Sequence, residues 1–74
     1  MKLKKNMCVW YPCERTDLGG TATGVVSSCR RRQKKSKIYD LTIQVSYSGE
    51  TETVAVMDGD VTTWDDRPVT LADV

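Results

Sequence analysis

The chain contains no histidine and no phenylalanine among its 74 residues, and it has only two prolines. Without histidine, the side chain that most often acts as a general acid or base near neutral pH is missing. The serines and cysteines have no plausible base in the sequence, and Leu18-Gly19-Gly20-Thr21 lacks the Lys-Ser/Thr ending of a phosphate-binding loop. We therefore expect a protein that is not an enzyme.

Cysteine is scarce, and its three occurrences, Cys8, Cys13 and Cys29, are an odd number. No secretory leader pattern opens the chain. Both features favour a reducing compartment, nuclear or cytoplasmic, over a disulfide framework. A structural zinc site would need a fourth ligand, so we expect no metal and no cofactor, and cysteines that pack as small apolar side chains.

Long apolar runs are also missing, since none approaches the ~20 residues that a membrane-spanning helix needs. We expect a soluble domain without a membrane partner. A chain of this size buries only about 60% of the surface that its unfolded form exposes, which leaves little room for an internal active site. The expected organisation is a monomer with a flexible basic lead at residues 1–6 and one domain at residues 7–74.

What the sequence does contain is a strand pattern over residues 39–57. Apolar side chains at every second position from Tyr39 to Tyr47 alternate with polar ones. Ser48-Gly49 predicts a tight turn, and Glu50–Met57 a second strand, so the two form an antiparallel hairpin. Three residues of the first strand are expected to be buried: Leu41, Ile43 and Val45.

Further short strands are predicted at residues 7–11 and 21–28, and residues 61–64 form either a short last strand or a helical turn. No amphipathic helix accompanies them. Residues 12–21 have the composition of a loop. Gly24 inside the second strand indicates a bulge or a close backbone approach. Residues 69–74 either add a short strand or lie across one open end. The fold class is therefore all-β, a small barrel of four to five antiparallel strands.

Charge is divided along the chain, although the net charge is only +1. Residues 1–47 hold ten Lys or Arg and three acidic residues, whereas residues 48–74 hold seven acidic residues and one Arg. The halves either pair within the fold or give the surface a basic pole. The basic residues concentrate in a segment expected to be an exposed loop, residues 29–37, with six cations: Arg30, Arg31, Arg32, Lys34, Lys35 and Lys37.

The order of these elements resembles the SH3-like barrel of Tudor and related chromatin-reader domains over about residues 7–64. Val9-Trp10-Tyr11-Pro12 resembles the aromatic first strand of that family, residues 21–26 its small second strand, and residues 39–60 its long central hairpin. Residues 19–26 also resemble a KOW element, a short nucleic-acid or protein-binding segment of other SH3-like barrels. The resemblance implies a small barrel that binds a peptide or a nucleic acid.

In an up-and-down arrangement, the end of the first strand and the hairpin turn lie at the same end of the barrel. This brings Trp10, Tyr11 and Tyr47 together as an aromatic pole, with Glu50 the nearest carboxylate after Tyr47. Tudor domains that read methylated side chains commonly carry an acidic or Asn residue closer to that aromatic. The basic loop, with Tyr39 and Asp58, is expected at the opposite end.

The aromatic pole has two interpretations. Ring faces attract cations by about 0.5–2 kcal/mol each, so a methylated ammonium group fits between them, with Glu50 completing the cage. Alternatively the rings fill the core of a domain that has no Phe. We expect Trp10 in the core, Tyr11 and Tyr47 with one ring face open, and Trp64 as a lid closing the barrel.

Three functions follow as hypotheses. The first is a non-catalytic Tudor-like module in a chromatin or RNA-associated protein, which reads a modified or basic peptide. The second is a barrel that binds DNA or RNA through residues 30–37, since each Lys or Arg contact to phosphate adds affinity; such a basic run is also typical of a solvated loop or a localisation signal. The third is a small viral or accessory protein that inhibits a host factor.

Overall fold

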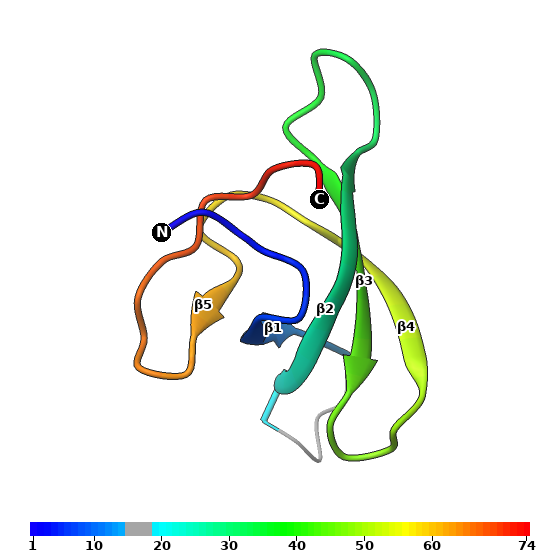
Figure 1. Cartoon of the computed structure of the whole chain (residues 1–74), viewed down its shortest axis with the longest axis vertical. Coiled ribbons are helices and arrows are strands. Elements are labelled where there is room, and N and C mark those ends of the chain that lie inside the picture. The colour runs from blue at the N-terminus through cyan, green and yellow to red at the C-terminus, as the bar shows by residue number, and fades with distance from the viewer. Residues whose placement is uncertain (15–18) are drawn as a thin grey trace.

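Five antiparallel strands form one sheet in the computed structural model, which describes residues 1–14 and 19–74 (Figure 1). The part of the predicted loop 12–21 that spans residues 15–18 lies outside the described residues. The sheet order is β4-β3-β2-β1-β5, so β4 and β5 form its two edges. The all-β class is confirmed, and the barrel-like sheet is not closed. The strands are β1 (Cys8–Pro12), β2 (Thr21–Arg31), β3 (Tyr39–Val45), β4 (Thr51–Val56) and β5 (Thr62–Thr63).

Strand β3 lies where its alternation predicted, with its apolar row inside the core. Leu41, Ile43 and Val45 have no exposed surface, whereas Gln44 between them is exposed. Val56 of β4 completes this part of the core. The predicted register is therefore confirmed, because a slip by one residue would have exchanged the two faces.

The turn of the β3–β4 hairpin falls at Ser48-Gly49 as predicted, but it is wider than a two-residue turn. The Val45 amide donates to the Glu50 carbonyl at 2.8 Å, and the Gly49 amide donates to the Val45 carbonyl at 2.7 Å. Gly49 has a φ of 73°, a conformation that glycine adopts without steric cost. Tyr47 consequently leaves the inward row of β3 and is 46% exposed.

Strand β2 is longer than predicted and continues into the basic segment. Cys29 is buried and pairs with Leu41, and Arg31 pairs with Tyr39 at the end of the ladder. The exposed loop that connects β2 to β3 therefore consists of residues 32–38 instead of 29–37. The ladder is irregular between Val26 and Ser28, so the bulge lies there.

The two aromatic residues of β1 have exchanged the roles that the sequence suggested. Tyr11 is completely buried, whereas Trp10 is 37% exposed. The expectation of a core Trp10 and an open Tyr11 ring is wrong. Because side chains alternate along a strand, Tyr11 shares the inner face with Val9, and its small partner Ala22 on β2 leaves room for the phenol ring.

Both terminal segments pack against the sheet. Residues 1–6 were expected to fray, yet Leu3 is buried and its amide donates to the Thr70 carbonyl at 3.0 Å. Residues 69–74 form none of the five strands; Thr70 bridges to Lys2, the Val69 amide donates to the Val61 carbonyl at 3.1 Å, and Val69 and Leu71 are buried. The Val74 amide donates to the Cys29 carbonyl at 2.9 Å, so the C-terminal segment is tied to β2.

Candidate functional site

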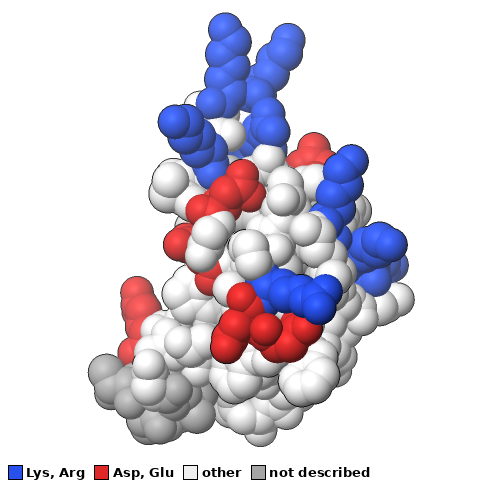
Figure 2. Space-filling model, turned by 90° about the vertical axis from the view of Figure 1, so that its left-hand side faces the viewer, with Lys and Arg blue, Asp and Glu red and all other residues white. Residues whose placement is uncertain are grey.

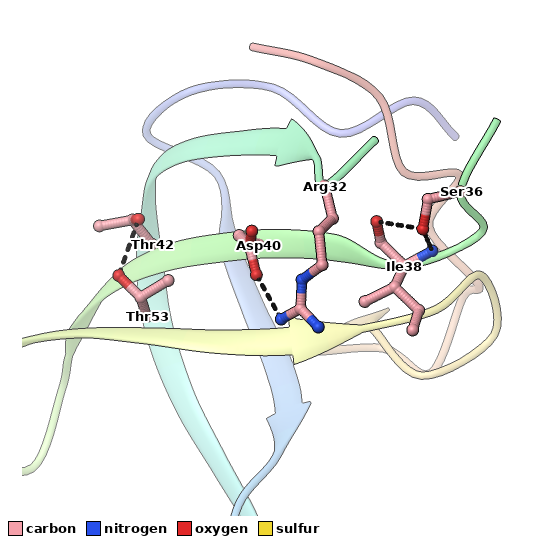
Figure 3. Close-up of polar contacts among 6 residues, drawn as sticks. All are labelled: Arg32, Ser36, Ile38, Asp40, Thr42 and Thr53. Atoms are coloured by element: carbon pink, nitrogen blue, oxygen red, sulfur yellow. Dashed lines mark hydrogen bonds and ion pairs between the residues drawn. The ribbon is translucent and has the colours of Figure 1, made fainter. Parts of the chain in front are cut away.

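Lys and Arg side chains gather at the end of the molecule from which the β2–β3 loop projects (Figure 2). The loop is held by its own hydrogen bonds. The Arg32 amide donates to the Ile38 carbonyl at 3.0 Å, and the Ser36 amide donates to the Gln33 carbonyl at 3.0 Å. The Ser36 hydroxyl accepts from the Ile38 amide at 3.0 Å (Figure 3). The cations of this basic end, Arg30 to Lys37, are therefore presented by a defined hairpin.

Arg31 is anchored on Tyr39. Its Nη2 and Nε atoms donate to the Tyr39 hydroxyl at 2.8 and 3.3 Å, and its Cζ atom lies 5.4 Å from the centre of the Tyr39 ring. The hydrogen bond to Tyr39 raises the pKa of Arg31. The Arg31 backbone amide donates to the Asp73 carboxylate at 2.7 Å, so the C-terminal segment also fixes this position.

Arg32 points in the direction of β3 and pairs with Asp40 (Figure 3). Its Nη2 atom lies 2.8 Å from the Asp40 carboxylate, and the two side chains are 48% and 39% exposed. The hydrogen bond to Asp40 raises the pKa of Arg32. Exposed pairs of this kind contribute little stability, so their main effect here is to orient the guanidinium group.

The remaining cations of the basic end have no ion-pair partner among the described residues: Arg30, Lys34, Lys35 and Lys37. At the base of the loop lies a hollow of about 580 Å³, lined by Arg31, Arg32, Lys34 and Tyr39 among others. Asp73 is the one carboxylate among the described lining residues. This arrangement suits an anionic ligand, because several cations converge on a concave surface.

The expected aromatic pole is only partly assembled. The pKa of Tyr11 is raised to about 12, mainly by burial and also by the charges of Glu52 and Tyr47, so these groups lie near the Tyr11 hydroxyl. Trp10 is on the other face of the sheet, where it lines a separate hollow of about 460 Å³ with Asp60 and Asp66. The structure therefore brings Tyr11 and Tyr47 together but does not bring Trp10 to them.

Three features of this region were missed or misplaced by the sequence reasoning. Glu52 lies beside Tyr11, and its position on the same row of β4 as Val54 and Val56 was the available signal. Glu50, the predicted cage carboxylate, is exposed in the hairpin turn. Trp64 was expected to close the barrel as a lid; it is 76% exposed, so that expectation is wrong.

The cysteines are free thiols, with Cys29 buried and Cys8 exposed. Among the described residues, no group of three His, Cys, Asp or Glu side chains is placed to hold a metal ion. The described part of the chain also has no helix of the length and hydropathy needed to cross a membrane. No protein-family model, curated protein or solved structure matches the chain.

Proposed function

We propose that this protein is a non-catalytic binding module whose basic end binds the phosphate backbone of a nucleic acid. The observation that carries the proposal is that neighbouring side chains hold two of the six cations in place and leave the other four exposed. Arg31 and Arg32 are held by Tyr39 and Asp40, while the other four are exposed and have no ion pair among the described residues. Cations that are held in place lose less conformational freedom on binding.

Phosphate contacts by Lys and Arg give affinity without reading the base sequence. The hollow beside Tyr39 offers a place for one phosphate group, because Arg31, Arg32 and Lys34 converge on it. Arg is suited to such contacts since its planar guanidinium donates several hydrogen bonds at once. The proposed ligand is accordingly a duplex or single strand of any sequence.

Charge reversal tests this proposal directly. Fluorescence anisotropy would measure the binding of a duplex of about 20 base pairs to the wild type and to Lys34→Glu/Lys35→Glu. A matched control is Lys4→Glu/Lys5→Glu, which changes the net charge equally in the exposed lead. We expect the loop variant to lose affinity about tenfold or more and the control to lose much less. Equal losses, or no binding by the wild type, would contradict the proposal.

A second candidate function, reading of a modified or basic peptide, is favoured by the surroundings of Trp10. Its side chain is 37% exposed and shares a hollow with the carboxylates of Asp60 and Asp66. An indole face and two carboxylates together attract a cationic side chain. The test is a titration of the wild type and of Trp10→Leu with a trimethyl-lysine peptide and with its unmodified form. Trp fluorescence would report whether the peptide binds at Trp10. Identical responses of the two proteins would reject Trp10 as the reading residue.

A further inference from the structure

The sheet has a free edge at β4. This strand pairs with β3 on one side, and no strand of the described residues pairs with its other side. The hydrogen bond from the Val45 amide to the Glu50 carbonyl determines which residues of β4 form backbone hydrogen bonds with β3. Backbone groups of every second residue then point away from β3. These residues are Thr51, Thr53 and Ala55.

The Thr pair of this hairpin agrees with that assignment. Thr53 lies opposite Thr42 on β3, and the two hydroxyl oxygens are 3.1 Å apart (Figure 3). Side chains approach most closely at pairs that exchange no backbone hydrogen bonds with each other. The amide and carbonyl of Thr53 are consequently available on the outer edge of β4.

A hollow of about 750 Å³ separates this edge from the end of β1. The side chains on the inward face of β4 become more exposed toward the start of the strand: Val56 is buried, Val54 is half-buried and Glu52 is exposed. The hollow lies where this face is no longer covered. Glu14, from the other side of the hollow, is the second charged residue among the described lining residues. The lining that the structure describes is therefore acidic.

The Tyr11 hydroxyl is the second, independent observation at this place. Within the described part of the chain, it is a buried side-chain oxygen without a hydrogen-bond partner. Glu52 and Cys13, which line the hollow, both lie close enough to affect its ionisation. Buried polar groups in folded proteins nearly always have a partner, and the nearest acceptor for this hydroxyl is the Glu52 carboxylate. Tyr11 is not itself a lining residue, so its hydroxyl lies behind Glu52 and Cys13, and the two acidic lining residues Glu52 and Glu14 are the groups that a ligand in the hollow would meet.

We propose that the gap between β1 and β4 binds an extended segment of a partner protein, which adds a strand to the free edge of β4. A Lys or Arg of that segment enters the hollow and pairs with Glu52 and Glu14, while the buried Tyr11 hydroxyl behind Glu52 positions that carboxylate. The backbone of the segment pairs with Thr51, Thr53 and Ala55, in the manner of strand addition. A second copy of β4 fits less well, because it would bring its own Glu52 to an acidic hollow.

Amide chemical shifts of the isotope-labelled protein test this proposal. The probes are two peptides of about seven residues, of alternating Thr and Val around a central Lys or a central Glu. With the Lys peptide, we expect the amides of Thr51, Thr53 and Ala55 to shift most, and an affinity about tenfold above that of the Glu peptide. Shifts confined to the β2–β3 loop, or equal affinities for the two peptides, would overturn the proposal.

Two variants examine the side chains of the hollow. Tyr11→Phe keeps the ring and removes only the unpaired hydroxyl, and Glu52→Gln removes one charge at an exposed position. Both are expected to fold and to weaken binding of the Lys peptide at least threefold. Glu50→Gln is the matched control, since it makes the same change at an exposed position of the β3–β4 turn, outside the described lining of this hollow. Unchanged binding in both hollow variants, or shifts at Thr53 that depend on protein concentration without peptide, would exclude the proposed occupant.

Discussion

Gly24 of β2 lies so close to Ile43 of β3 that no side chain fits between them. A Cβ atom added at Gly24 would be 2.0 Å from the Ile43 Cγ2 atom and 2.8 Å from the Gln44 carbonyl oxygen. The second of these neighbours is backbone and cannot rotate away. The glycine therefore sets how closely the two central strands approach, and the sequence-based expectation of a close approach at this position is confirmed.

Gly24→Ala should destabilise the protein by about 1–3 kcal/mol, the usual cost of overpacking a core. Chemical denaturation of the purified variant would measure the loss. Ser27→Ala, an exposed position on the same strand, is the control and should change stability by less than about 0.5 kcal/mol. Equal effects of the two substitutions would show that β2 and β3 are not packed as closely as described.

Tyr11→Ala should cost about 3–5 kcal/mol, enough to unfold most domains of this size, because Tyr11 is among the largest fully buried side chains. Trp10→Ala should cost much less, since over a third of that side chain is exposed. Thermal melts followed by circular dichroism would compare the two. A folded Tyr11→Ala together with an unfolded Trp10→Ala would reverse the assigned faces of β1.

Stability should fall at alkaline pH because Tyr11 ionises less readily in the folded protein. Burial raises its pKa from 10.0 to about 12. The unfolded chain releases the proton first, so the stabilisation is complete below pH 10 and is lost as the pH rises to about 12. The loss amounts to at most about 3 kcal/mol. Denaturation at several pH values should show a shallower decline for Tyr11→Phe, and equal declines would contradict this cause.

The β2–β3 loop should contribute little to folding. Lys34, Lys35 and Lys37 are exposed, so their replacement by Glu should shift the free energy of unfolding by less than about 1 kcal/mol. Arg31→Ala should cost more, because it removes the interaction with Tyr39. A melting curve for each variant checks this order. A large loss from the Lys substitutions would mean that the loop supports the fold.

The faces of β3 could be predicted from the sequence, but those of β1 could not. On β3, polar residues such as Gln44 separate the apolar ones, so alternation alone identifies the buried row. On β1, the neighbours Trp10 and Tyr11 are both aromatic, and periodicity gives no preference. The choice depends on pairing with Ala22, a residue that is distant in the chain.

The candidate site could also be predicted only in part from the sequence. The six cations were visible as a run in the sequence, and so was their grouping on one connection between strands. Their arrangement was not, because it depends on partners outside the run: Tyr39 for the Arg31 side chain and Asp73 for its backbone amide. The free edge of β4 was hidden for a related reason, since strand order follows from pairing and not from composition.

The salt dependence of nucleic-acid binding tests the central claim most directly. For the wild type, the logarithm of the association constant should fall with the logarithm of salt concentration, with a slope near −0.9 for each duplex phosphate neutralised. Mutation of Lys34 and Lys35 to Ala should make that slope shallower by about one unit for each phosphate that these lysines neutralise. A slope near zero for the wild type, or the same slope for both proteins, would contradict phosphate binding by the basic end.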